Sequence, residues 1–480
     1  MYNFEKKTKI VATLGPTSED KDTIRALIKN GANIVRLNFS HGDYTEKKAK
    51  IQIVRELEKE LDIVIPVILD TKGPEIRTHK FKDDGVMIEK DSIVRISMEE
   101  KLGTSTSFSV TYPNLYDDIK INDMIKIDDG KLHLLVVDKD PINREIIVKP
   151  FNSHFVTNRK GLNIPSARLH LPALSEQDKK DILFGLKEGI DLIAASFIRS
   201  KEDILEIREY IKEIGCENVP IIAKIENFEG CQNIEEIIKV ADGVMVARGD
   251  LGVEIEPERV PIIQGKLIAL CQKEGKPVIT ATQMLDSMQV NPLPTRAEVS
   301  DVATAIREGS DAVMLSGETA NGSYPVASVN MQTRIAKIME NELDYKELAS
   351  KAYATSDKSL ADALANSIAN TTNLIDARLI VCFNKASDCA LRIAKARPKT
   401  PLVFVTDNRK SAVKSMPSFA IYPIVVPSLP ETVEEMEKVT LDAAKRVGLG
   451  KDEPIIITGG IPVDNKDINF MRVIYLREAK

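Results

Sequence analysis

The sequence has none of the features expected of a protein that works in a membrane or on nucleic acid. Its apolar runs all fall short of the roughly 18 residues that a membrane-spanning helix needs. The 66 basic and 72 acidic residues give a net charge of −6, and no basic block stands out. The first seven residues also lack the apolar core of a signal peptide. These absences predict no nucleic-acid or membrane partner and a cytoplasmic location.

Cysteine is also scarce. The five cysteines, at positions 216, 231, 271, 382 and 389, are an odd number and form no Cys-x-x-Cys pair. This usage favours a reducing compartment in which most of them are plain buried thiols. At 480 residues the chain is too long for one ordinary core, so we expect two to four domains.

Eight short β-branched runs recur before residue 320. Most are near-continuous apolar stretches, which is typical of parallel strands buried on both faces. Amphipathic helical stretches lie between most of them, for example at 21–30, 202–214 and 260–274. Eight strand–helix units in this order predict an α/β fold built on a (β/α)8 TIM barrel. The predicted strands are 9–15, 32–40, 65–73, 192–198, 220–227, 243–251, 276–284 and 312–317.

Two further units interrupt or follow this pattern. About 120 residues separate the third and fourth strands, far more than an ordinary loop. Short strands predicted at 86–89, 92–97, 124–128, 132–137 and 144–149 indicate a small all-β lid domain inserted at the barrel rim. After residue 345, strands at 377–383, 401–406, 420–426 and 454–458 alternate with helices at 360–374, 389–396 and 432–447, which predicts an α/β open-sheet domain. We expect the boundaries 1–72 and 170–345 for the barrel, 73–169 for the lid and 346–480 for the C-terminal domain.

Polar residues follow every predicted barrel strand, at the end that carries the active site in this fold. The clearest case is Lys224 and Glu226 on one strand, with Arg248 and Asp250 after the next. Lys224 and Glu226 are two apart on a strand and so point to the same side. A pair of carboxylates on adjacent strands suits Mg²⁺, and a lysine beside them can stabilise charge on a phosphoryl group or an enolate. The alternative, an ordinary barrel with polar strand ends, is disfavoured by eight such ends on one rim.

Several segments of the chain match sequence motifs of one protein family, and they occur in the same order as in that family. They are 9–16 (KIVATLGP), 35–42 (VRLNFSHG), 69–78 (LDTKGPEIRT), 160–165 (KGLNIP), 171–175 (LPALS), 223–227 (AKIEN), 246–252 (VARGDLG), 281–284 (ATQM), 294–298 (PTRAE) and 314–319 (MLSGET). On these segments the chain resembles the pyruvate kinase family from end to end. The resemblance implies the same barrel, inserted lid and C-terminal α/β domain.

The resemblance also implies a reaction and a set of residues. Phosphoryl transfer from phosphoenolpyruvate to ADP would give ATP and, after protonation of the enolate, pyruvate, in the last step of glycolysis. The implied catalytic residues are Arg36, Lys224 and Thr282, and the implied substrate contacts are Arg36, Lys224, Gly249, Asp250 and Thr282. The implied nucleotide contacts are Asn38, His41, Arg77 and Lys160. The implied cation ligands are Glu226 and Asp250 for Mg²⁺ (or Mn²⁺), and Asn38, Ser40, Asp70 and Thr71 for K⁺.

Several expectations concern regulation and subtype. Members of the family that need K⁺ carry Glu where K⁺-independent members carry Lys, and Glu75 fills that position here. The effector loop of the family corresponds to residues 383–389, where Asp388 adds negative charge and the usual glycine is missing; the segment 458–469 departs as well. Activation by a sugar bisphosphate is therefore doubtful, and a homotetramer is expected from the resemblance alone.

Alternatives stay open for single residues and for the whole chain. Asp70 can be read as a cap, Arg248 as a structural ion-pairing residue, and His41 as a positioning residue without acid–base work. Another Mg²⁺-dependent barrel enzyme that handles an oxoacid enolate, such as an aldolase or lyase, would share the Glu226–Asp250 pair. A non-catalytic descendant would be expected to have lost Lys224, Glu226, Asp250 or Thr282, and all four are present.

Overall fold

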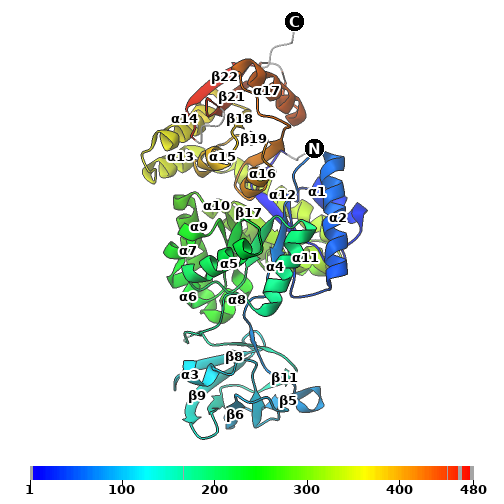
Figure 1. Cartoon of the computed structure of the whole chain (residues 1–480), viewed down its shortest axis with the longest axis vertical. Coiled ribbons are helices and arrows are strands. Elements are labelled where there is room, and N and C mark those ends of the chain that lie inside the picture. The colour runs from blue at the N-terminus through cyan, green and yellow to red at the C-terminus, as the bar shows by residue number, and fades with distance from the viewer. Residues whose placement is uncertain (1–3, 166, 451, 463–466, 476–480) are drawn as a thin grey trace.

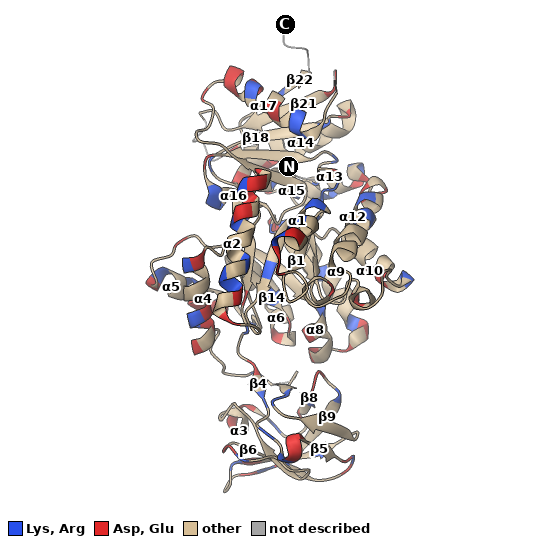
Figure 2. Cartoon of the chain, turned by 90° about the vertical axis from the view of Figure 1, so that its right-hand side faces the viewer, with Lys and Arg blue, Asp and Glu red and all other residues tan. Residues whose placement is uncertain are grey.

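The computed structural model describes residues 4–165, 167–450, 452–462 and 467–475. Three parts follow one another along the long axis of the molecule: the C-terminal α/β part, the barrel and the small β part (Figure 1). Residues of both charge signs are scattered over all three (Figure 2). Within the described residues, none of the helices combines the length and the hydrophobicity that crossing a bilayer would take.

Eight parallel strands close the barrel in the order β1-β17-β16-β15-β14-β13-β3-β2. All eight predicted strands are confirmed, and each ends a few residues earlier than predicted. Apolar side chains such as Val11, Ile68, Ile222 and Ile279 fill the interior. The strands are β1 (Lys9–Thr13), β2 (Ile34–Asn38), β3 (Val67–Asp70), β13 (Leu192–Ala195), β14 (Ile221–Ile225), β15 (Gly243–Ala247), β16 (Val278–Ala281) and β17 (Ala312–Leu315).

Amphipathic helices surround the barrel and bury their apolar faces on the outer side of the strands. Several begin at a capping box, in which Ser175, Ser200 or Thr295 and an acidic residue three positions later bond each other's backbone N–H groups. The helices are α1 (Lys21–Lys29), α2 (Tyr44–Leu61), α4 (Glu176–Glu188), α5 (Lys201–Glu213), α6 (Phe228–Gln232), α7 (Ile234–Val240), α8 (Arg248–Glu254), α9 (Val260–Glu274), α10 (Arg296–Glu308), α11 (Gly317–Ala320) and α12 (Pro325–Asn341).

The predicted lid is a separate all-β unit between β3 and β13, with its own apolar core. It forms a seven-stranded sheet in the order β4-β12-β8-β9-β10-β6-β7 and a two-stranded sheet of β11 and β5. Four of its strands, β4, β7, β11 and β12, were not predicted, because two to four residues show too little alternation. The elements are β4 (Ile76–Arg77), β5 (Gly85–Ile88), β6 (Val94–Ser97), β7 (Ser107–Ser109), α3 (Leu115–Asp118), β8 (Met124–Ile127), β9 (Leu132–Asp140), β10 (Glu145–Pro150), β11 (His154–Thr157) and β12 (Gly161–Asn163).

The C-terminal part is the predicted open sheet with helices on both faces. Its strands run in the order β20-β19-β18-β21-β22, of which β22 is antiparallel and was not predicted. Helices α13 and α16 were also missed. The elements are α13 (Tyr345–Ala354), α14 (Leu360–Ile375), β18 (Leu379–Phe383), α15 (Asp388–Lys395), β19 (Leu402–Thr406), α16 (Arg409–Ser415), β20 (Ile421–Val425), α17 (Val433–Val447), β21 (Pro454–Gly459) and β22 (Phe470–Tyr475).

The fold also bears on the predictions about the cysteines, the segment 458–469 and the domain boundaries. All five cysteines are free thiols, and three of them are buried, as predicted. Of the departing segment 458–469, residues 463–466 lie outside the described residues. The residue-level domain boundaries stay predictions.

Candidate active site

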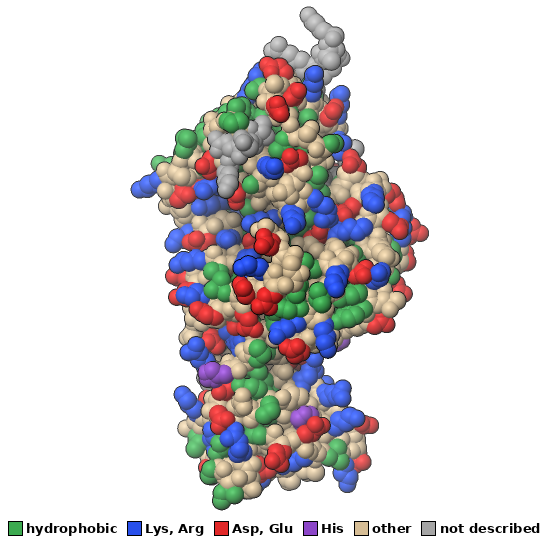
Figure 3. Space-filling model, viewed as in Figure 1, with side chains coloured by type: hydrophobic (Ala, Val, Ile, Leu, Met, Phe, Trp, Pro, Cys, Tyr) green, Lys and Arg blue, Asp and Glu red, His purple; other side chains and the backbone are tan. Residues whose placement is uncertain are grey.

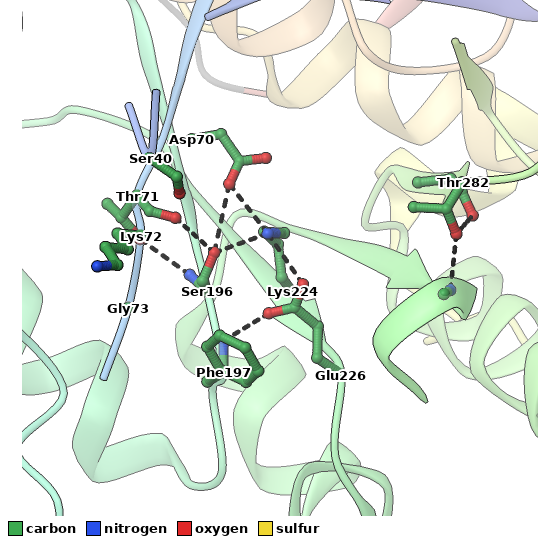
Figure 4. A network of polar contacts seen from close by, with 12 residues as sticks. Ser40, Asp70, Thr71, Lys72, Gly73, Ser196, Phe197, Lys224, Glu226 and Thr282 are labelled. Atoms are coloured by element: carbon green, nitrogen blue, oxygen red, sulfur yellow. Dashed lines mark hydrogen bonds and ion pairs between the residues drawn. The ribbon is translucent and has the colours of Figure 1, made fainter. Parts of the chain in front are cut away.

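Lys224 lies near the end of β14 and is the centre of a buried polar network (Figure 4). Its ammonium nitrogen Nζ is 2.9 Å from Asp70 Oδ1, 2.9 Å from Glu226 Oε1 and 2.6 Å from Ser196 Oγ. Lys224 and Glu226 thus share one side of the strand, as their spacing predicts. Burial would lower the pKa of Lys224, but Asp70 and Glu226 outweigh that effect and raise the pKa above its ordinary value. The lysine is therefore a permanent cation at this rim.

Asp70, at the end of β3, joins Lys224 to Arg36 on β2. Its other oxygen, Oδ2, accepts a hydrogen bond of 2.6 Å from Arg36 Nε, and one terminal nitrogen of Arg36 donates to Thr13 Oγ1 at 3.0 Å. Burial would raise the pKa of Asp70, yet Arg36 and Lys224 hold it below its usual value. The side chain is 1% exposed and caps no described helix. Asp70 is thus an ionised bridge between two cations, and the reading of it as a helix cap is wrong.

Glu226 and Asp250, the predicted magnesium ligands, are adjacent. The Glu226 carboxylate accepts from the Phe197 backbone N–H at 2.7 Å, and it lies close enough to Asp250 to raise the pKa of that carboxyl. Asp250 lines the cavity beside it. Desolvation of its carboxyl by the surrounding protein, and next the charge of Glu226, raise the pKa of Asp250 to about 7. Two crowded carboxyls, one of which holds a proton near neutral pH, fit a site for a divalent cation.

Helix α8 begins at Arg248, directly after β15. The N–H of Gly249, an implied substrate contact, donates to Thr282 Oγ1 at 2.8 Å. Thr282 follows β16 with a left-handed φ of 68°, a strained value for a β-branched residue that turns its side chain toward α8. Arg248 donates to the Thr282 carbonyl at 2.7 Å and to Asp301 at 2.6 Å. Its bonds are therefore structural, as one of the two readings proposed.

The predicted potassium ligands gather around the ends of β2 and β3. Asn38 lies opposite Asp70 in the register of these strands. Its side-chain oxygen accepts from the Ser40 N–H at 3.0 Å. Thr71 Oγ1 accepts from the Ser196 N–H at 3.0 Å, and Figure 4 draws Ser40, Asp70 and Thr71 on the same side of the network. This cluster offers hydroxyl, amide, carboxylate and carbonyl oxygens within one small region.

A cavity of about 660 Å³ opens between the barrel rim and the lid. Arg77 and Lys160 line it together with Glu75 and Asp250. Arg77 pairs with Glu75 at 2.6 Å, and Lys160 pairs with Asp128 at 2.8 Å. Burial would raise the pKa of Asp128, but the bonds from Lys160 and His154 lower it to about 2. Figure 3 shows the indentation between barrel and lid.

The four predicted nucleotide contacts are not all brought together. Along the cavity wall, as far as the described residues define it, Arg77 and Lys160 are present while Asn38 and His41 are not. His41 is exposed in the loop after β2.

Two residues that sequence reasoning left out of the site hold this network in place. Ser196 and Phe197 directly follow β13; the first bonds Lys224 and the second bonds Glu226. Phe197 has a left-handed φ of 57°. Ser196 is a polar residue near the end of the predicted strand 192–198, which is a signal that could have placed it at the rim. Phe197 acts through its backbone, so its side chain gives no such signal.

Comparisons with known proteins agree with this architecture. The family model described as pyruvate kinase, barrel domain, matches residues 5–329, and the one described as pyruvate kinase, alpha/beta domain, matches residues 362–474. The chain belongs to the pyruvate kinase family. A pyruvate kinase from Geobacillus stearothermophilus is 46% identical over 472 residues, which is 98% of this chain and 80% of that protein. One from Staphylococcus aureus (strain MRSA252) is 45% identical over 471 residues, with the same coverage.

A solved pyruvate kinase structure, from Cryptosporidium parvum, superposes with a TM-score of 0.93 at 34% identity, covering 98% of this chain and 96% of that one. Membership of the pyruvate kinase family makes the chain a phosphotransferase and confirms the predicted fold class.

Proposed function

We propose that the protein transfers the phosphoryl group of phosphoenolpyruvate to ADP, giving ATP and pyruvate, with Mg²⁺ (or Mn²⁺) and K⁺ as cofactors. The observation that carries the proposal is the position of the Lys224 ammonium group between Asp70 and Glu226, with Arg36 beyond Asp70 and Asp250 beside Glu226. Two buried cations next to two carboxyls that can share a metal are what transfer of an anionic group requires.

Glu226 and Asp250 would hold the divalent cation, since two neighbouring carboxyls supply hard oxygen donors and each raises the cost of ionising the other. When bound, this cation would neutralise negative charge on the substrate oxygens. Asn38, Ser40, Asp70 and Thr71 would hold K⁺ with hard oxygens. Glu75, which pairs with Arg77, supports the K⁺-dependent subtype because no lysine ammonium fills that position.

Arg36 and Lys224 would bind the phosphoryl oxygens. Arg36 has five N–H donors, of which Nε and one terminal nitrogen are bonded to Asp70 and Thr13, and its remaining terminal nitrogen would face the substrate. Lys224 would stabilise the charge of the phosphoryl group as it leaves the enol oxygen for the terminal oxygen of ADP. The enolate that remains would then take up a proton at carbon.

Thr282, Gly249 and Asp250 would orient the substrate carboxylate, and Thr282 would take part in a water-mediated delivery of that proton. The hydrogen bond between Gly249 and Thr282 supports this assignment by fixing the threonine hydroxyl against the start of α8. Asn38, His41, Arg77 and Lys160 would contact the nucleotide. Lys160 reaches the cavity from the lid, so closure of the lid would bring it closer and exclude water.

Regulation and assembly follow from the family as proposals. Around the start of α15, Lys385 and Asp388 are exposed while Ser387 is buried. A phosphate would therefore meet Asp388 without easy access to the Ser387 hydroxyl, which supports a weak effector or none. A homotetramer in the cytoplasm is the expected working form.

The test is pyruvate formation from phosphoenolpyruvate and ADP, with Mg²⁺ and K⁺ supplied together and separately, followed by a panel of sugar phosphates and AMP. Activity that needs both cations is the expected result. A folded sample that forms no pyruvate with both cations present would refute the proposal and favour the lyase or the non-catalytic alternative.

A further inference from the structure

Ser196 contacts Lys224 and Asp70, which both have proposed roles in the reaction. The proposed function gives Ser196 itself no role. The residue is 3% exposed. Its hydroxyl accepts from Lys224 Nζ at 2.6 Å and lies 2.7 Å from the Thr71 carbonyl oxygen and 3.3 Å from Asp70 Oδ1. A serine has one proton to donate. Because the Thr71 contact is the shorter of the two, the proton goes to that carbonyl and the oxygen lone pairs face the lysine.

The partners of Lys224 differ in what else they must do. An ammonium group has three N–H donors, and Asp70, Glu226 and Ser196 accept one each. Both carboxylates are also proposed cation ligands, so they would share their oxygens with a bound cation. Ser196 is neutral and has no such second partner.

The position of Ser196 is itself fixed by the backbone around it. Its N–H donates to Thr71 Oγ1 at 3.0 Å. Gly73, where the chain leaves β3 for the lid, packs so closely that a Cβ there would lie 2.9 Å from Ser196 Cβ and 2.8 Å from the Phe197 ring. The backbone and Cβ of Ser196 are therefore held in place, and the bonds to Lys224 and to the Thr71 carbonyl hold its hydroxyl in one rotamer.

We propose that Ser196 is a positioning residue for phosphoryl transfer: its hydroxyl keeps the Lys224 ammonium group in place while the carboxylates of Asp70 and Glu226 serve their cations. The inference rests on the proposed function. Ser196 acts through Lys224 and needs no contact with substrate.

The first experiment compares Ser196→Ala with Ser328→Ala, a control that removes another buried hydroxyl, one bonded to the Tyr324 carbonyl. We expect kcat of Ser196→Ala to fall about ten- to hundredfold, the range for a lost hydrogen bond to a charged group. The dissociation constant of phosphoenolpyruvate, measured by calorimetry with Mg²⁺ and without ADP, should stay within about threefold, because ground-state binding is shared among many groups. Ser196→Cys keeps the side-chain volume but offers only a weak sulfur acceptor, so its kcat should fall as in Ser196→Ala. This variant replaces Ser196→Ala in the experiment if the alanine variant does not fold.

The second experiment repeats Ser196→Ala in a Lys224→Met background. If Ser196 acts through Lys224, the second substitution should change kcat by less than about twofold, because the interaction is already gone. An equal loss in both backgrounds, or a wild-type kcat in Ser196→Ala and Ser196→Cys, would overturn the inference. Wild-type protein that forms no pyruvate would instead overturn the proposed function, and this inference with it.

Discussion

The Glu226–Asp250 pair should make binding of the divalent cation depend on pH. The pKa of Asp250 is raised to about 7, so below that pH an incoming cation must displace a proton. For one competing proton the apparent dissociation constant is multiplied by roughly 1.1 at pH 8, 2 at pH 7 and 11 at pH 6. Affinity for Mg²⁺ should therefore fall about tenfold between pH 8 and pH 6.

Calorimetric titration of Mg²⁺ into substrate-free protein measures this directly. Repeating the titration in buffers with different heats of ionisation gives the number of protons released, which should be about 0.9 at pH 6 and about 0.1 at pH 8. Asp250→Asn should bind Mg²⁺ more weakly and release almost no proton. Glu254→Gln is the matched control, since Glu254 lies on the same helix and also has a raised pKa, caused by burial, but bonds Asn163.

A dissociation constant that stays level from pH 6 to pH 8, or proton release that persists in Asp250→Asn, would refute the reasoning. The same pKa has a consequence for folding. The folded protein holds this proton more tightly than the unfolded chain, whose carboxyl titrates near 3.8. The stabilisation is therefore complete below about pH 4 and is lost as the pH rises through about 7 in the absence of metal.

Three further predictions test the site and its support. Lys224→Met should leave substrate binding largely intact and lower kcat by several orders of magnitude, so a near-normal kcat in steady-state assays would remove Lys224 from its role. Glu75→Lys should reduce the K⁺ requirement, and an unchanged K⁺ activation curve would count against the subtype argument. Gly73→Ala should destabilise the protein by about 1–3 kcal/mol in thermal unfolding, because φ there is +73° and a Cβ would clash with Ser196 and Phe197. Gly161→Ala, with no atom within 4 Å of the added Cβ, should leave the melting temperature unchanged.

The barrel could be predicted from the sequence because each of its strands is a continuous apolar run buried on both faces, as in β14 and β15. The short lid strands could not, since β4 has two residues and β12 has three and both depend on neighbours far away in sequence. The edge strand β22 was missed although it is rich in β-branched and aromatic residues. Its half-exposed side chains lack the apolar continuity that identified the central strands.

The side chains at the centre of the site were predictable for a similar reason. Lys224 and Glu226 share one side of a strand through simple alternation, and their 2.9 Å contact agrees with it. The Ser196–Phe197 turn and the hydrogen bond from Gly249 to Thr282 were not predictable. Both depend on left-handed backbone at Phe197 and Thr282, residue types that seldom adopt it, so local sequence preference gives the wrong expectation there.

The charges of the network explain why its residues depend on one another. Arg36 and Lys224 contribute two buried cations, and Asp70 and Glu226 contribute two buried carboxylates. Buried ion pairs seldom add net stability, but removal of one partner leaves an unpaired buried charge at a cost of about 3–5 kcal/mol. Activity of variants at these four charges, Lys224→Met included, should therefore be compared with the thermal unfolding of the same variants. Ser196 and Asp250 avoid this problem, since one is neutral and the other holds a proton near pH 7, so variants at these two positions report most directly on the chemistry of the site.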